Sequence, residues 1–279
     1  MKHLIIVRGG GEMASGVIHT LFRAGYRVLV LEQAKPTAVR RTVSFSEAMY
    51  RGEQTVERVT CKKAKNLKEA YKRVKKGELI MIEDPKAECI WKLEPDVLID
   101  AIVAHKNLGT ERDMAKHTIA LGPGFCAGQD VDTVVETMRG HNMGRLIFEG
   151  YSSKTDGISD EVSDQKEQLT FAPVDGKLEL LRGLSSFVKA GEAIAVIHSK
   201  EGGQIEIRSE IDGVLRGAMP DDCEVKKGEK ILDVHPTLTQ ADCYTISERS
   251  RCVGGAVLTA VVAWEHEAGK HSFFPSLRS

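Results

Sequence analysis

Long hydrophobic runs are missing from this chain of 279 residues, which limits where it can work. The apolar run near its start, Leu4–Val7, has only four residues before a charge and three glycines. That run is too short for the apolar core of a signal peptide. No stretch approaches the roughly 20 apolar residues that a membrane-spanning helix needs. We therefore expect a cytoplasmic protein without a membrane partner.

An excess of charge of one sign and closely spaced cysteine pairs are also missing. The chain has 39 Lys and Arg against 40 Asp and Glu, so no global field favours nucleic acid as a partner. Its six cysteines form no CxxC pair, which predicts reduced thiols. The HExxH, G-x-S-x-G and P-loop motifs are absent, which disfavours zinc proteases, serine hydrolases and P-loop nucleotide triphosphatases. No metal site is predicted.

The first 160 residues alternate strand-like and helix-like segments. The patterns predict strands at 3–7, 27–32, 78–84, 96–104 and 117–123, and helices at 12–25 and 67–77. Continuous apolar strands between helices are typical of a parallel sheet covered on both faces. The sequence therefore predicts an α/β fold in which residues 1–160 form a Rossmann-like nucleotide- or cofactor-binding domain.

An internal repeat follows this first region. Residues 174–198 align without gaps on residues 211–235, so that Gly176 matches Gly213 at a spacing of 37 residues. A repeat of this size cannot bury its apolar side alone, so the two copies should close on each other. The repeat resembles the barrel-sandwich hybrid of biotinyl and lipoyl domains. Residues 169–236 are thus predicted to form a small all-β domain of that type, inserted in or appended to the first.

Lys200 lies roughly where biotinyl and lipoyl domains carry their modified lysine. Ser199 and Glu201 flank it, whereas methionines flank the lysine of biotin carriers. We therefore expect no covalently attached biotin or lipoate and interpret the small domain as a docking or substrate-covering module.

Two further segments surround the repeat. The polar stretch 152–168 predicts a linker, since apolar residues are sparse in it. The segment 237–265 predicts a strand or turn followed by a helix near Ser250, and we expect it to return to the first domain. Residues 266–279 are predicted to be a poorly ordered tail.

Glycines between the first strand and the first helix form the strongest candidate site. The glycines predicted to bind a cofactor there are Gly9, Gly10, Gly11 and Gly16. Glycine lets backbone N–H groups approach a phosphate, and a helix N-terminus adds partial positive charge. Glu32 ends the second strand, as in dinucleotide-binding folds, and is a further candidate. The Glu12 carboxylate at the helix start opposes a nearby pyrophosphate, unless it points away or ligates a metal.

Other candidate ligand-binding residues follow the predicted strands, where doubly wound sheets bind ligands. Arg40 and Arg41 are expected to clamp a phosphate, with an exposed pair of arginines in local salt bridges as the alternative. The same edge is predicted to carry His105, Lys106, Asn107, Gly122 and Gly124. A later loop supplies Arg139, His141, Asn142 and Arg145.

Two residues within these segments raise separate questions. Asp100 lies within the predicted central strand 96–104, so its charge needs a buried partner. Cys126 is the candidate catalytic residue, because glycine N–H groups and a predicted helix start beside it would favour the thiolate. The alternative is that Cys126 is a small, semi-buried residue that fills a gap.

The combination of motifs resembles a known family. The motifs are RGGGEMASG, AVRRTVSFSEA, KNLGT, ALGPGF, RGHNMGR, the repeat and CYTIS. Together, over about residues 1–262, they resemble the YqeB family, whose members are called selenium-dependent molybdenum hydroxylase system proteins. The Rossmann part of that family looks related to xanthine-dehydrogenase accessory proteins. The resemblance implies an accessory role in making or inserting a selenium-containing molybdenum cofactor, with a client molybdenum hydroxylase as partner.

Two functions therefore stay open. The first is a maturation factor that binds a pyrophosphate-containing ligand, molybdopterin dinucleotide or a related pterin, at the glycine turn. The second is an NAD(P)-dependent oxidoreductase acting on a small anionic substrate. The sequence leaves open which ligand is bound, whether any reaction is catalysed, and whether the chain forms a homo-oligomer.

Overall fold

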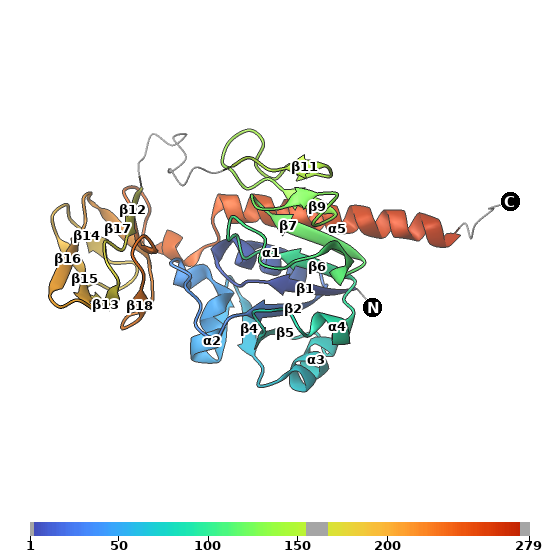
Figure 1. Cartoon of the computed structure of the whole chain (residues 1–279), viewed down its shortest axis with the longest axis horizontal. Coiled ribbons are helices and arrows are strands. Elements are labelled where there is room, and N and C mark those ends of the chain that lie inside the picture. The colour runs from blue at the N-terminus through green and yellow to red at the C-terminus, as the bar shows by residue number, and fades with distance from the viewer. Residues whose placement is uncertain (1–2, 155–166, 274–279) are drawn as a thin grey trace.

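The computed structural model describes residues 3–154 and 167–273, which form a larger α/β part and a small all-β part (Figure 1). In the larger part, the described strands build a nine-stranded sheet in the order β10-β9-β7-β6-β1-β2-β5-β4-β3. Its strands are β1 (Leu4–Arg8), β2 (Arg27–Glu32), β3 (Glu53–Val56), β4 (Val59–Lys63), β5 (Leu79–Glu83), β6 (Val97–Asp100), β7 (His117–Leu121), β9 (Thr133–Val135) and β10 (Leu146–Ile147). A separate pair is formed by β8 (Cys126–Ala127) and β11 (Gly150–Tyr151).

Helices cover both faces of the central strands. They are α1 (Glu12–Arg23), α2 (Ala48–Arg51), α3 (Leu67–Lys75), α4 (Ile90–Leu93) and α5 (Glu248–Phe273). In β1, Ile5 and Val7 face the core under α1 and α5, whereas Leu4 and Ile6 face the core under α3 and α4. Both faces of β1 are therefore buried, which explains why its sequence is continuously apolar rather than alternating.

The predicted fold class is wrong for the sheet. Its central strands are parallel, but β3 pairs antiparallel with β4, and β10 pairs antiparallel with β9. The sheet is therefore mixed, with an antiparallel hairpin at each edge, and not the parallel sheet expected of a Rossmann-like domain. The β3–β4 turn consists of Glu57 and Arg58, both with positive φ, as in tight hairpins. No glycine marks this turn, and so the sequence pattern gave no sign of it.

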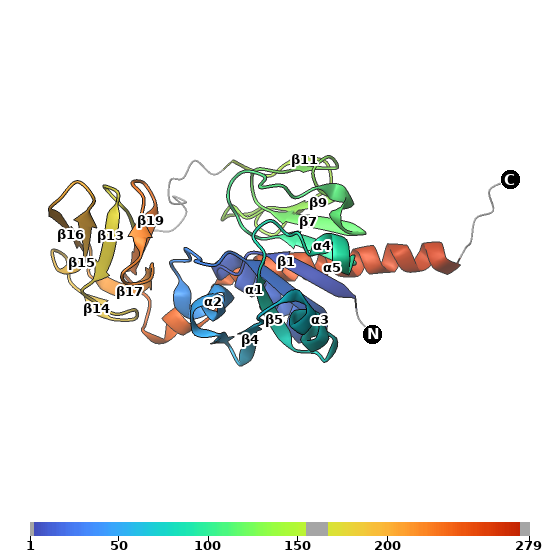
Figure 2. The same ribbon diagram turned by 60° about the horizontal axis from the view of Figure 1, so that its bottom comes forward.

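The small part also differs from the predicted barrel-sandwich hybrid. It consists of two four-stranded antiparallel sheets, in the orders β12-β19-β17-β14 and β16-β15-β13-β18. The strands are β12 (Gln168–Phe171), β13 (Gly176–Leu180), β14 (Phe187–Val188), β15 (Ala193–Ser199), β16 (Gln204–Arg208), β17 (Gly213–Ala218), β18 (Glu224–Val225) and β19 (Lys230–His235). Figure 2 shows these sheets together, beside the larger part. The resemblance of short turn motifs thus did not determine how the strands are shared between sheets.

The two copies of the repeat exchange contacts. Strand β13 of the first copy pairs with β18 of the second, and β14 of the first pairs with β17 of the second. Asp175 accepts a hydrogen bond of 2.9 Å from the backbone N–H of Lys227. Its counterpart Asp212 accepts one of 2.8 Å from the N–H of Ala190. Each Asp-Gly motif therefore fastens the turn of the other copy.

The matched glycines of the repeat occupy equivalent, crowded positions. A Cβ added at Gly176 would lie 2.4 Å from the carbonyl oxygen of His198. A Cβ added at Gly213 would lie 2.5 Å from the carbonyl oxygen of His235. A side chain at either position would therefore collide with the neighbouring strand.

The C-terminal segment lies against the larger part, where α5 packs along α1 (Figure 1). Helix α5 continues through the first residues of the segment predicted to be a tail, and residues 274–279 lie outside the described residues. Most of the predicted linker, residues 155–166, also lies outside them. Among the helices that the structure describes, none is long and apolar enough to cross a membrane.

Candidate functional site at the glycine turn and the junction of the two parts

Internal hydrogen bonds hold the glycine turn between β1 and α1. The backbone N–H of Gly10 donates to Oε2 of Glu32 at 2.7 Å. The carbonyl oxygen of Gly10 accepts from the N–H of Ser46 at 2.8 Å and from the Ser15 hydroxyl at 3.1 Å. Both backbone groups of Gly10 are thus already bonded, so Gly10 fixes the shape of the turn.

Gly9 and Gly11 differ in what surrounds them. Gly9 has a φ of +92°, and an added Cβ would lie 3.0 Å from the carbonyl oxygen of Ala101, so the turn approaches the loop after β6 closely. Gly11 is the N-cap of α1, and an added Cβ would meet nothing within 4 Å. No side chain caps α1 at this end. The first turn of α1 therefore presents backbone N–H groups beside open space.

Burial has the largest effect on the pKa of Glu32. It raises the pKa of this carboxyl above the ordinary value, although the N–H groups of Gln33 and Gly10 oppose the shift. Oε1 accepts from the N–H of Gln33 at 2.8 Å, while Oε2 accepts from Gly10. In a dinucleotide site, the acidic residue at this position bonds the ribose hydroxyl. Here both of its oxygens are bonded to the backbone.

Arg40 and Glu12 form an ion pair. Nη1 of Arg40 lies 2.9 Å from Oε1 of Glu12, and the Arg40 side chain is only 5% exposed. The Ser44 hydroxyl donates to the Arg40 carbonyl oxygen at 2.8 Å. Nε of Arg40 and the hydroxyl of Ser46 are buried and have no partner within the described residues. The pairing neutralises the Glu12 carboxylate that would otherwise repel an anion at the start of α1.

Arg41 points its guanidinium at a carboxylate of its own chain. Its Nε and Nη2 donate to Oε1 and Oε2 of Glu47 at 2.8 and 2.9 Å, a bidentate geometry. Glu47 is 3% exposed. Burial lowers the pKa of Arg41, but the hydrogen bonds and charge of Glu47 outweigh it and the net direction is upward. The predicted phosphate clamp is thus divided, because Arg40 and Arg41 each hold a different glutamate.

A buried network anchors the loop after β6. Nη1 of Arg8 donates to the Thr110 hydroxyl at 2.5 Å, and that hydroxyl donates to Oδ2 of Asp100 at 2.5 Å. Arg8 also lies 3.5 Å from the Asp100 carboxylate. These contacts supply the partner that the charge of Asp100 was expected to need.

The two predicted loops at this edge contact each other. A Cβ added at Gly124 would lie 2.6 Å from the Cα of Lys106, so only glycine permits this approach. Oδ1 of Asn107 accepts from the N–H groups of Gly109 and Thr110, both at 2.8 Å, and thereby shapes the turn. The Lys106 side chain is exposed. Of this group, Lys106 is the residue whose charged end faces solvent.

Gly16 and Gly122 are crowded by other elements. A Cβ added at Gly16 would lie 2.3 Å from the carbonyl oxygen of Ser250, so Gly16 allows α1 and α5 to pack closely. A Cβ added at Gly122 would lie 2.5 Å from the Thr137 hydroxyl oxygen. Neither glycine opens onto the turn, and their predicted role in cofactor binding gains no support from these contacts.

Cys126 begins a strand and not a helix. It pairs with Tyr151 across β8 and β11, and its N–H donates to Oδ2 of Asp130 at 2.7 Å. The side chain is buried, with an exposed fraction of 5%. A hydrogen bond with the Cys126 side chain raises the pKa of Tyr151. The expected activation by a helix start is therefore wrong, because no helix begins at this turn.

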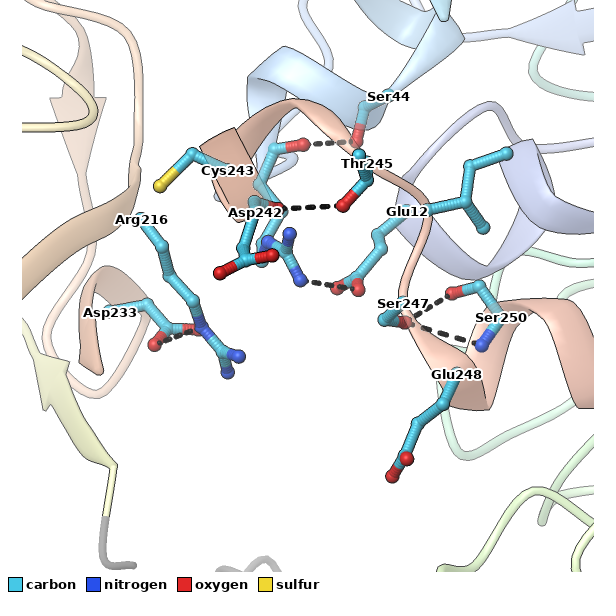
Figure 3. Close-up of polar contacts among 12 residues, drawn as sticks. Glu12, Ser44, Arg216, Asp233, Asp242, Cys243, Thr245, Ser247, Glu248 and Ser250 are labelled. Carbon is cyan, nitrogen blue, oxygen red and sulfur yellow. Dashed lines mark hydrogen bonds and ion pairs between the residues drawn. The ribbon is translucent and has the colours of Figure 1, made fainter. Parts of the chain in front are cut away.

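Charged side chains of the small part lie near the ion pair of Arg40 and Glu12, at the junction of the two parts. Nε of Arg216, on β17, lies 2.8 Å from Oδ1 of Asp233, on β19, which is 1% exposed. Arg216 also contacts Glu167. Burial lowers the pKa of Arg216, but the carboxylates of Asp233, Glu167 and Glu12 raise it, and the net direction is upward. Figure 3 shows Arg216 and Glu12 approaching the junction from the two parts of the molecule.

The junction also contains a thiol and an imidazole that the sequence analysis did not single out. Burial raises the pKa of Cys243, with the nearby Arg40 and Arg216 opposing the shift. Burial and the charge of Arg216 lower the pKa of His235. The Thr42 hydroxyl donates to the Cys243 carbonyl oxygen, which ties η4 (Ala241–Tyr244) to η1 (Arg41–Val43). No group of three or more potential metal ligands occurs within the described residues.

The comparison with solved structures gives weak likenesses. The ectoine utilization protein EutE (DoeB) from Ruegeria pomeroyi is 11% identical, with 85% of this chain and 86% of that chain covered and a TM-score of 0.26. A succinylglutamate desuccinylase from Silicibacter sp. TM1040 is 12% identical, with 84% and 85% covered and a TM-score of 0.26. Scores of this size support no conclusion about fold or activity.

The comparison of sequences is more informative. No family model matches the chain. The chain is 39% identical over 268 residues to "Uncharacterized protein YqeB" of Escherichia coli (strain K12). The match covers 96% of this chain and 49% of the relative, so the chain spans about half the length of that protein. This identity supports a place for the chain in the YqeB family.

Proposed function

We propose that the chain binds an anionic, pyrophosphate-containing ligand at the N-terminus of α1 and serves as an accessory protein for selenium-dependent molybdenum hydroxylases. The observation that carries this proposal is the open position of Gly11. It begins a helix of 12 residues that has no side-chain cap, and an added Cβ there would meet nothing within 4 Å. Unsatisfied N–H groups and the helix dipole together favour an anion at such an end.

The charges around the turn are compatible with an anionic ligand. Arg40 pairs with Glu12 at 2.9 Å, which removes the main electrostatic objection to a phosphate at this helix start. The guanidinium of Arg216 reaches the same junction from the small part, near enough for the charge of Glu12 to act on it. A ligand placed here would lie between the two parts, as small-molecule sites often do.

The ligand class and the client in this proposal rest on the resemblance to the YqeB family. A dinucleotide form of molybdopterin contains a pyrophosphate, a group that the open N-terminus of α1 is suited to hold. The use of Glu32 favours this role over a nicotinamide oxidoreductase. Both oxygens of Glu32 accept backbone N–H groups, at 2.7 and 2.8 Å, so a ribose hydroxyl would have to share an oxygen that is already bonded.

The accessory role can be tested in cells that lack this protein and express a selenium-dependent molybdenum hydroxylase. The cells are complemented with the parent chain, with Gly11→Val, or with Gly255→Ala as the matched control. A Cβ at Gly255 also meets nothing within 4 Å, but Gly255 lies on α5 away from the turn. The measurements are hydroxylase activity and the selenium content of the purified client.

We expect the parent and Gly255→Ala to restore both quantities and Gly11→Val to restore neither. Full activity of the client in cells without the protein would contradict the accessory role. Full restoration by Gly11→Val, expressed at the parent level, would remove the helix start from the proposed site.

A further inference from the structure

A cavity is formed by the segment that follows β9, and its lining residues all lie within 136–153. Its volume is about 440 Å³, within the range of roughly 300–1,000 Å³ that small-molecule sites occupy. The side chains that matter for its chemistry are those of Glu136, Asn142, Arg145, Phe148, Glu149 and Tyr151. No function described above uses this cavity.

Two of the lining residues are exposed aromatics. Phe148 is 64% exposed and Tyr151 is 70% exposed. A single exposed aromatic residue is ordinary, but two that line one cavity present ring surface that a planar ligand could cover. The backbone of Tyr151 is fixed, because β11 pairs with β8 and places Tyr151 opposite Cys126.

The remaining lining groups offer hydrogen bonds of both kinds. The guanidinium of Arg145 donates, the carboxylate of Glu149 accepts, and the amide of Asn142 does both. All three residues are exposed and therefore accessible to a ligand. A ligand that matches this set carries both hydrogen-bond donors and acceptors beside a flat ring, as a heteroaromatic ring with N–H and carbonyl groups does.

Hydrogen bonds of Glu136, from its carboxylate and its backbone, fix the wall of the cavity. Oε1 and Oε2 of Glu136 accept from the N–H groups of Met138 and Ser153, both at 2.8 Å. The carbonyl oxygen of Glu136 accepts from the N–H of Gly144 at 2.8 Å, and its N–H donates to the carbonyl oxygen of Arg145 at 2.9 Å. These bonds join the two sides of the loop, so the polar and aromatic side chains project from a shaped scaffold.

We propose that this cavity binds a planar heteroaromatic ring of the purine type, stacked on Phe148 and Tyr151, with its polar edge on Asn142, Arg145 and Glu149. Guanine presents N–H donors and a carbonyl acceptor on one edge, so guanosine is the probe. None of its lining residues belongs to the glycine turn, and the inference does not depend on the function proposed there.

The first experiment measures guanosine affinity by titration calorimetry on the full chain. Base stacking on an aromatic residue is sensitive to alanine substitution, so Phe148→Ala and Tyr151→Ala should each weaken binding by about tenfold or more. Tyr151→Phe keeps the ring and should bind within about threefold of the parent. Phe187→Ala is the matched control, since Phe187 is 67% exposed but lies in the small part. It should bind like the parent.

The second experiment identifies what the polar edge selects. Indole offers a flat ring without the mixed edge, and we expect it to bind at least about tenfold more weakly than guanosine. The Asn142→Ala variant should have a smaller difference in affinity between guanosine and indole. The absence of guanosine binding at millimolar concentration would overturn the proposal, as would unchanged affinity in both alanine variants. Equal affinity for indole and guanosine would overturn the assignment of the ligand class.

Discussion

The carboxylate of Glu32 accepts a hydrogen bond of 2.7 Å from the backbone N–H of Gly10, so the glycine turn is closed by an anion of its own chain. The N–H of Gly10 is therefore already hydrogen-bonded and is not available to a phosphate that approaches the turn. The first turn of α1, which follows the open position of Gly11, has no side-chain cap. This relationship shifts the expected anion site from the glycines themselves to the helix start.

The burial of Glu32 predicts a pH dependence of stability. Burial raises the pKa of Glu32 in the folded protein. A carboxyl with a raised folded pKa contributes most to stability below its unfolded pKa of about 4.3, and that contribution is lost as the pH rises through the folded pKa. We therefore expect the free energy of unfolding of the parent, relative to Glu32→Gln, to fall as the pH rises above about 4.3. Urea unfolding at each pH measures this difference, and a constant difference would contradict the argument.

Removal of Arg41 should destabilise the fold without affecting anion binding. Arg41→Ala leaves the Glu47 carboxylate buried, with only the exposed Arg51 at 3.6 Å. Breaking a buried ion pair costs about 3–5 kcal/mol, and we expect somewhat less, about 2–3 kcal/mol, because Arg51 remains. Arg51→Ala serves as the control and should cost less than about 1 kcal/mol. A loss of pyrophosphate affinity in folded Arg41→Ala would restore the phosphate clamp to Arg41.

The contact between α1 and α5 predicts opposite effects for two glycines. In Gly16→Ala, the new Cβ would lie 2.3 Å from the carbonyl oxygen of Ser250, so we expect a loss of about 1–3 kcal/mol or more. Gly255→Ala adds a methyl group to α5 where nothing lies within 4 Å, and we expect a gain of up to about 1 kcal/mol. Thermal and urea unfolding compare the two variants. Equal effects would mean that α5 does not pack on α1 in solution.

The burial of Cys126 predicts slow alkylation. Cys126 is 5% exposed, whereas Cys252 is exposed on α5. Thiol reactivity requires access, so Cys252 should react at least about tenfold faster at neutral pH. Peptide mass spectrometry after timed alkylation of the folded chain gives both rates. A Cys126 rate that matches that of Cys252 would return this thiol to the list of candidate reactive groups.

The central strands of the fold could be predicted from sequence because burial on both faces leaves a continuous apolar run, as in β1 and β2. The edge strands could not. Strands β3 and β4 are short, partly exposed, and joined by Glu57 and Arg58 in a turn without glycine. Hairpins of this kind are decided by pairing at the edge of the sheet, and a strand's own residues do not reveal the direction of its neighbour.

The candidate site was partly predictable for the same reason. The sequence marked Glu12, Arg40 and Glu32 as chemically important, and the structure brings them to the same turn. It could not show that Arg40 pairs with Glu12, 28 residues away, or that Arg41 pairs with Glu47. It also gave no sign of Arg216, because that side chain reaches the junction only through the position of the small part. Pairing of charges depends on tertiary contacts that no local pattern records.

The most direct test of the central claim is titration calorimetry of inorganic pyrophosphate into the parent chain, Gly11→Val and Gly255→Ala. A Cβ added at Gly11 meets nothing within 4 Å, so we expect the variant to fold like the parent while its side chain covers the start of α1. We predict that the parent and Gly255→Ala bind pyrophosphate equally and that Gly11→Val binds at least about tenfold more weakly, a loss of about 1.4 kcal/mol. Equal affinity in Gly11→Val and the parent, or no binding to the parent, would contradict an anion site at the N-terminus of α1.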